Sequence, residues 1–124
     1  MHNVCRFDYA ILRVVPRVER EEFINVGVIL SCPAQNFLEA RIEPDWERLH
    51  AFAPELQRKE VEHYLRIIPK ICAGSGPIGK LKPRERFYWL TAQRSTIVQT
   101  SPVHTGLTTD VNQTMEKLVE KMVR

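Results

Sequence analysis

The chain has 124 residues, of which 44% are hydrophobic and 27% are charged, and its formal net charge at pH 7 is +3. These values are typical of one globular domain over residues 1–124, and they exclude a membrane span, because no apolar run approaches ~18 residues. The net charge is also too small to indicate binding to nucleic acid. The basic side chains gather in residues 58–94, which hold nine Lys and Arg against three Glu. That stretch is either ordinary solvated surface or a surface that faces an anion.

Three cysteines, Cys5, Cys32 and Cys72, give no disulfide framework, because their number is odd and their spacings are long. The N-terminus lacks the basic-then-apolar pattern of a secretion signal, since Arg6, Asp8 and Arg13 interrupt it. We therefore expect a cytoplasmic protein with reduced, buried, structural thiols.

The first third of the chain predicts three strands. Residues 7–15 and 24–32 are short, rich in β-branched side chains and bounded by turn formers, while residues 37–43 alternate apolar and charged. Short connections between them favour an antiparallel meander. The charged connector, residues 17–22, is either a loop or one helical turn. Gly27 inside the second strand indicates a bulge or a close backbone approach.

Helical spacing begins at Asp45, which is a good N-cap for a short helix. Residues 61–72 carry an apolar stripe at helical spacing, and Pro69 is expected to kink or stop that helix. Residues 84–91 fit a helix or a strand equally well. Residues 95–100 predict a fourth strand, which Pro102 either ends or restricts to a sheet edge.

A terminal helix follows, capped by Thr109 or Asp110, with an inner face of Val, Met and Leu side chains. The predicted fold class is therefore α+β: an antiparallel sheet of about four strands, in an undetermined order, with helices packed on one face.

Motifs for catalysis or cofactors are weak. Residues 74–81, GSGPIGKL, resemble a phosphate-binding loop, but Leu81 replaces the hydroxyl that ligates magnesium and a helix precedes the loop. We expect a surface turn there. No C-x-x-C or H-x-x-x-H spacing indicates a metal, and no Ser or Cys lies beside an obvious base. We therefore expect neither a metal nor a cofactor, and no catalytic residue is assigned.

Two polar segments attract attention: the connector, and residues 94–106, which are crowded with hydroxyls and amides between Arg94 and His104. Each segment is either solvated surface or a recognition surface. As a recognition surface, the connector would be a charged patch for a protein partner, and residues 94–106 would form a pocket for an anion or a polar peptide. We expect the two segments to meet in one shallow polar site. Its expected binding residues are Arg13, Arg17, Glu22, Asn25, Arg94, Gln99 and His104.

Residues 9–30, YAILRVVPRVEREEFINVGVIL, together with RSTIVQ at 94–99 and SPVHTG at 101–106, resemble the bacterial family known as domain of unknown function 3037. The resemblance covers nearly the whole chain. It implies a small stand-alone cytoplasmic protein with no assigned activity, whose gene neighbours one for a kinase-like protein of the toxin–antitoxin type. It implies no catalytic residues.

The sequence thus favours a non-enzymatic binding or accessory module for a protein partner, for which the kinase-like toxin-type protein is a candidate. The alternative is a small enzyme or sensor that binds a phosphate- or carboxylate-bearing ligand through Arg13, Arg17, Arg94 and His104. A sheet edge open to an added strand favours the first, and a pocket in which Arg and His converge favours the second.

Overall fold

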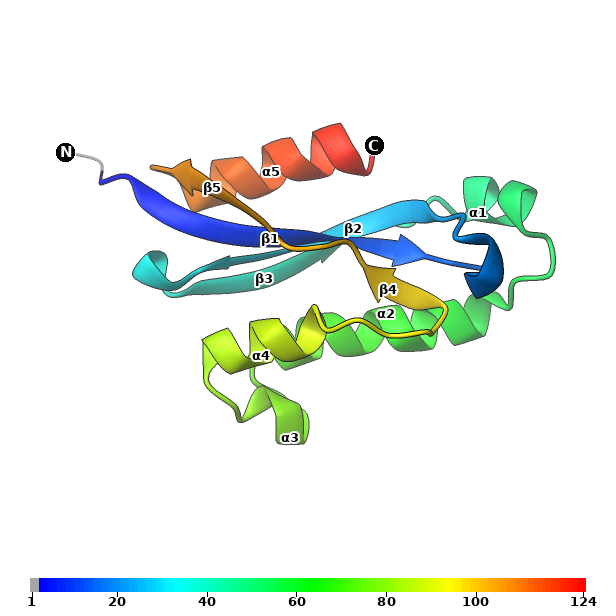
Figure 1. The fold of residues 1–124 in the computed structure, drawn as a ribbon, viewed down its shortest axis with the longest axis horizontal. Coiled ribbons are helices and arrows are strands. Elements are labelled where there is room, and N and C mark those ends of the chain that lie inside the picture. The colour runs from blue at the N-terminus through cyan, green and yellow to red at the C-terminus, as the bar shows by residue number, and fades with distance from the viewer. Residues whose placement is uncertain (1–2) are drawn as a thin grey trace.

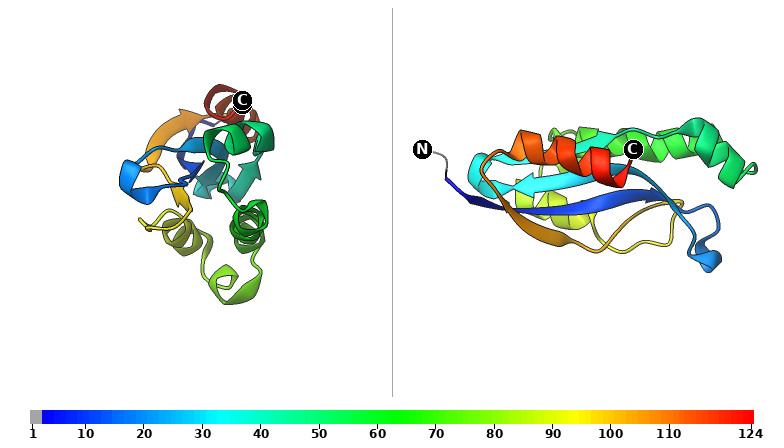
Figure 2. Two further views of the ribbon diagram at one scale, coloured as in Figure 1. Left: turned by 90° about the vertical axis from the view of Figure 1, so that its right-hand side faces the viewer. Right: turned by 90° about the horizontal axis from the view of Figure 1, so that it is seen from above.

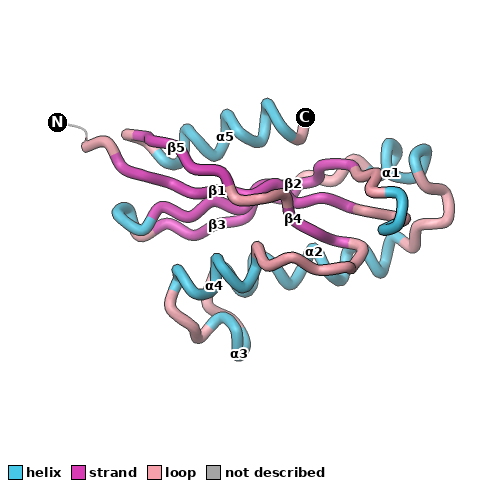
Figure 3. The backbone as a smooth tube through the Cα atoms, viewed as in Figure 1, coloured by secondary structure: helices cyan, strands magenta, loops and turns pink. Residues whose placement is uncertain are grey.

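The computed structural model describes residues 3–124, and its centre is a five-stranded antiparallel sheet (Figures 1 and 3). Four strands follow the order β3-β2-β1-β4, and β5 also pairs with β1. The strands are β1 (Cys5–Val14), β2 (Ile24–Cys32), β3 (Phe37–Ile42), β4 (Val98–Thr100) and β5 (His104–Thr108). The helices are α1 (Trp46–Phe52), α2 (Arg58–Cys72), α3 (Gly76–Gly79), α4 (Pro83–Leu90) and α5 (Val111–Met122), with 3₁₀ turns η1 (Val18–Arg20) and η2 (Pro33–Gln35).

The α+β class and the antiparallel meander β1-β2-β3 are confirmed. The helices lie on both faces of the sheet, whereas one face was expected: α5 covers one face, and α2 and α4 cover the other (Figures 1 and 2). The reason is visible in β1 and β2, whose apolar residues point to both sides. Leu12 and Ile29 pack with α2 and α4, while Ile11 and Val28 pack with α5. Strands buried on both faces read as continuous apolar runs.

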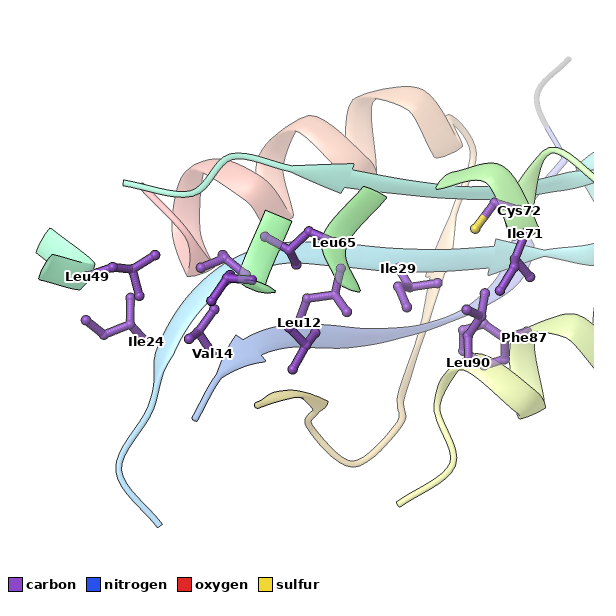
Figure 4. Packing of buried hydrophobic residues seen from close by; sticks show 13 residues of the cluster. Leu12, Val14, Ile24, Ile29, Leu49, Leu65, Ile71, Cys72, Phe87 and Leu90 are labelled. Atoms are coloured by element: carbon purple, nitrogen blue, oxygen red, sulfur yellow. The ribbon is translucent and has the colours of Figure 1, made fainter. Parts of the chain in front are cut away.

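The cluster on the α2 and α4 side is the larger of the two (Figure 4). Ile71 of α2 lies close to Phe87 and Leu90 of α4, whereas Leu65, farther along α2, lies over Leu12 of β1. On the opposite face, Val111, Met115 and Val119 of α5 are almost fully buried. The inner face expected for the terminal helix is therefore confirmed, and Asp110 is its cap: its side chain accepts a hydrogen bond from the Gln113 N–H at 3.1 Å.

β1 has partners along both edges, because β4 and β5 share the edge opposite β2. Pro102 separates β4 from β5 and has no N–H to donate. Ser101 fills the gap: its N–H donates to the Ile11 carbonyl at 2.8 Å, and its hydroxyl accepts from the Ile11 N–H at 2.8 Å. The late segment thus forms two short strands, where one strand over residues 95–100 was expected.

Gly27 marks a β-bulge, as its position inside a strand suggested. Leu12 pairs with Gly27 and Arg13 pairs with Asn25, so Val26 is the extra residue. A Cβ on Gly27 would lie 2.6 Å from the carbonyl oxygen of Arg41, which no side chain tolerates. The bulge reverses which side chains of β2 face each side of the sheet.

Two helical assignments are settled by packing. Residues 83–90 form α4, a helix, since Pro83 occupies its first turn and Phe87 and Leu90 enter the core. Of the two effects expected of Pro69, a kink or a stop, the stop is wrong, since α2 continues to Cys72. Burial of Ile71 and Cys72 stabilises the last turn, and the Arg86 side chain donates to the carbonyls of those two residues at 3.2 and 2.7 Å. Within residues 3–124, no helix has the length and apolar character needed to cross a membrane.

A polar clamp, Asp8–Arg84–Ser31–Thr105, ties α4 to the sheet. Arg84 donates to the Asp8 carboxylate and, at 3.1 Å, to the Ser31 hydroxyl, while the Thr105 hydroxyl donates to Asp8 at 2.6 Å. Burial raises the pKa of Asp8, but the hydrogen bonds from Thr105 and Arg84 and the charges of Arg84 and Arg6 outweigh burial and hold it below its usual value.

We expect removal of residues 110–124 to give an insoluble or molten chain. The deletion exposes the α5 face of β1 and β2, including Ile11, Val28 and Leu30. Each fully buried apolar side chain contributes roughly 1.5–3 kcal/mol, and a small domain has only roughly 5–15 kcal/mol in total. Near-UV circular dichroism and thermal unfolding of the truncated chain provide the measurement. A soluble chain with a cooperative transition would contradict the expectation.

We expect Asp8→Asn to lower the free energy of unfolding by about 2–3 kcal/mol at neutral pH, because Arg84 loses its anion. The depressed pKa of Asp8 means that the native carboxylate stabilises the fold above its unfolded pKa of about 3.9 and loses this effect as pH falls through the native value. The difference between wild type and variant should therefore narrow below about pH 4. Urea unfolding over a pH series measures this difference, with Glu120→Gln, at an exposed position on α5, as control. A difference that stays constant with pH would contradict the account.

Candidate functional site

A polar hollow of 550 Å³ opens where the connector meets the late segment. Its polar lining comes from β1 (Arg13), the turn after η1 (Glu21), the loop after α4 (Gln93, Arg94, Ser95) and β4 (Gln99), and Phe23 with two valines completes it. Of the expected binding residues, the structure brings Arg13, Arg94 and Gln99 to this hollow. Arg94 and Gln99 lie far from Arg13 in the sequence, and pairing of β4 with β1 brings the late segment to it.

Arg13 occupies the centre of a row of polar residues that crosses three strands. It pairs with Asn25 on β2 and with Gln99 on β4. Its guanidinium carbon lies 3.9 Å from the centre of the Phe23 ring, so the exposed Phe23 covers one face of the cation. The Gln99 amide is itself held in place, since it donates to the Thr96 carbonyl at 2.8 Å.

Arg13 is half-buried, and among residues 3–124 no carboxylate forms an ion pair with it. Its Nε is buried with no hydrogen-bond partner in this part of the chain, and the same holds for the Asn25 Oδ1 next to it. Burial lowers the pKa of Arg13, because the side chain loses water without gaining an anion. An arginine nevertheless keeps its charge in proteins. The hollow therefore presents a partly desolvated cation that forms no ion pair with a carboxylate of residues 3–124.

Arg94 forms the second cationic wall of the hollow. Its guanidinium lies 4.2 Å from the centre of the Trp89 ring and donates to the carbonyls of Trp89 and Leu90 at the end of α4. A cation is favourable at a helix C-terminus, where carbonyls lack partners. These contacts occupy part of its five N–H donors and fix the orientation of the remainder.

Glu21 is the only acid in the lining, and its backbone has φ of 56°. The left-handed conformation ends η1, because the Glu21 N–H donates to the Val18 carbonyl at 3.2 Å. Such a conformation is uncommon outside glycine. Glu21 and, two residues later, Phe23 line the hollow.

The remaining expected site residues do not line the hollow. Arg17 pairs with Glu55 at 2.6 Å, and Glu22 pairs with Arg20, so local ion pairs occupy both side chains outside the lining. Asn25 shares the row with Arg13, but its amide donates to the Met122 carbonyl at the end of α5 at 3.0 Å. His104, on β5, pairs with Tyr9 of β1. Tyr9 is four residues from Arg13 along β1, so His104 lies roughly 13 Å from Arg13 along the strand direction. The expected convergence of Arg and His is therefore wrong.

The hollow contains no histidine, cysteine or lysine among its lining residues. In the described part of the chain, no group of three His, Cys, Asp or Glu is placed to hold a metal ion. Besides the Glu21 carboxylate, the polar lining consists of guanidinium, amide and hydroxyl groups. Such groups bind carboxylate or phosphate through charge-assisted hydrogen bonds.

Glu21, Phe23, Gln93 and Ser95 also line the hollow, although the sequence did not mark them as binding residues. Phe23 had a usable signal, since it is a large apolar residue inside a charged connector. The others had none, because a single polar residue in a loop does not show which way the fold will turn it.

The thiols lie outside the hollow, and burial raises the pKa of Cys32 and, to about 11, of Cys72. Because the thiolate is the reactive form, we expect Cys72 in the native protein at pH 7 to react with Ellman's reagent about a hundredfold or more slowly than in the urea-unfolded chain. The cysteine variants Cys5→Ser and Cys32→Ser isolate this rate. Equal rates in the two states would show Cys72 to be accessible and active.

Comparison with known proteins places the chain in a family context without adding an activity. A family model described as "Protein of unknown function (DUF3037)" matches residues 9–123. No curated protein and no solved structure matches the chain.

Proposed function

Since the chain belongs to the DUF3037 family, for which no function is given, we propose from its own geometry that it is a non-enzymatic binding module for a protein partner. The surface that carries this role is the hollow, and the partner contributes an acidic segment. One observation supports the proposal above the others: Arg13 is half-buried beside a second arginine, with no carboxylate paired to it in the described residues.

The other buried charge on β1 provides the comparison. Asp8 is 4% exposed, and Arg84, Thr105 and Ser31 complete a hydrogen-bonded group around it. Arg17, Arg41 and Arg124 likewise pair with carboxylates on this chain. Desolvating a cation without an anion costs free energy in the isolated fold. A bound carboxylate recovers that cost, which is why an unpaired, partly buried arginine indicates recognition of an anion.

A protein segment suits the hollow better than a small catalytic substrate does. The donors of the hollow come from β1, the loop after α4 and β4, and so are spread over a wide surface. Its lining offers no histidine or cysteine for proton transfer or nucleophilic attack. The kinase-like, toxin-type protein implied by the family resemblance is the first partner to examine, because an accessory protein acts by occupying a partner's surface.

A small phosphate- or carboxylate-bearing ligand is the second candidate. The same Arg13 and Arg94 donors favour it, since bidentate recognition by guanidinium groups does not depend on the size of the molecule that carries the anion. Without His104, that candidate describes a sensor and not an enzyme with an imidazole base.

The test replaces Arg13 by Met, which retains the contact with Phe23 and removes the charge. We expect fluorescein-labelled hexaglutamate to bind the wild type saturably and to lose about tenfold or more of its affinity for Arg13→Met, measured by fluorescence anisotropy. We also expect the melting temperature to stay equal or rise, because a desolvated cation has been removed. A residue kept for stability would show the opposite.

Arg66→Met is the matched control, since Arg66 is exposed on α2 outside this hollow and the change in net charge is identical. Equal losses for the two variants would show a general charge effect and contradict the proposal. Tighter binding of oligothymidine than of hexaglutamate would point to nucleic acid. Binding of inorganic phosphate or acetate as tight as that of hexaglutamate would favour the small ligand.

A further inference from the structure

An apolar groove of 260 Å³ adjoins the hollow on the α2 and α4 side of the sheet. Its apolar lining comes mainly from α2 and α4, with contributions from β1, β4 and the loop after α4. On the α2 and α4 walls lie Tyr64, Ile67, Ile68 and Ile71 from α2 and Trp89 and Leu90 from α4. An apolar cavity of about 150 Å³ holds a benzene molecule. The groove therefore has room for a large branched or aromatic side chain.

Large apolar side chains form the rim of this groove and remain in contact with solvent. Tyr64, Ile67 and Trp89 are 38%, 39% and 39% exposed. Single exposed apolar residues are ordinary, but three that gather around one depression mark an interaction site.

Arg94 and Gln99 line both the groove and the hollow. Arg94 stands at the boundary, because its guanidinium stacks on Trp89 and donates to the last carbonyls of α4. A ligand that lies across this boundary meets apolar surface on one side of Arg94 and the Arg13 cation on the other.

We infer that the groove holds a large apolar side chain of the same acidic segment, so that the partner's motif is an apolar residue flanked by carboxylates. This inference rests on the proposed function and specifies its ligand. Charge complementarity supports it, since the cation at the boundary is matched by an acid next to the apolar anchor. A second copy docked symmetrically through the groove would instead bring two Arg94 side chains together, which like-charge repulsion disfavours.

The test compares two fluorescein-labelled peptides of equal charge, Glu-Glu-Leu-Phe-Glu-Glu and Glu-Glu-Ser-Ser-Glu-Glu, by anisotropy. We expect the wild type to bind the Leu-Phe peptide about tenfold or more tightly than the Ser-Ser peptide. Ile67→Ala should reduce this preference to about threefold or less while leaving the affinity for the Ser-Ser peptide unchanged. Leu107→Ala is the matched control, since Leu107 is a 72% exposed apolar residue on β5.

The outcomes separate this inference from the proposed function. Equal binding of both peptides, lost in Arg13→Met, would overturn the apolar anchor and leave the acidic recognition standing. Binding of neither peptide would overturn both. A dimer in sedimentation equilibrium that Ile67→Ala dissociates would make a second copy the occupant and overturn the inference. Octanoate that binds more tightly than the Leu-Phe peptide, and that loses affinity in Ile67→Ala, would make a small apolar ligand the occupant and would also overturn it. A melting temperature of Ile67→Ala close to that of the wild type shows that the variant is folded.

Discussion

Both edges of β1 are paired with other strands and both of its faces are covered by helices, and the remainder of the structure is arranged around this burial of β1. One edge pairs with β2, and the other is divided between β5 and β4. Helices cover both faces. A strand so enclosed has to account for every polar group it carries. Asp8 accepts hydrogen bonds from Arg84 and Thr105, whereas Arg13 forms no ion pair with a carboxylate of the described residues. This contrast between two residues of one strand separates a structural group from a recognition group.

Local signals were enough for most of the fold. The strands of the meander, α2 and α5 follow from apolar spacing, and the caps Asp45 and Asp110 follow from residue type at a helix start. β5 had no such signal, because residues 104–108 are mostly exposed and contain Gly106, and the strand exists only through pairing with β1. Gly106 is required there, since a Cβ would lie 2.5 Å from the Phe7 ring. α4 was ambiguous because its aromatic residues are distributed around the helix, and burial of Phe87 and Leu90 decides its form.

The site was only partly accessible from sequence for a different reason. Polar density drew attention to both segments, and Arg13, Arg94 and Gln99 do meet. Composition cannot show which charges are already neutralised. Arg17 forms an ion pair with Glu55, and Glu22 forms one with Arg20. The register between β5 and β1 places His104 away from Arg13. The presence or absence of an ion pair is a property of the tertiary structure, and it is the property that singles out Arg13.

The division of one β1 edge between β4 and β5 has a consequence for biosynthesis. During translation the meander β1-β2-β3 leaves the ribosome first, while the segments that complete its edge and cover one face, β4, β5 and α5, are made last. Until they emerge, the nascent chain displays an unpaired edge beside uncovered Ile11, Val28 and Leu30. Exposed strand edges and apolar surface are what chaperones bind and what aggregation begins from. A pause in translation after β3 and before α5 therefore prolongs the exposure of these surfaces.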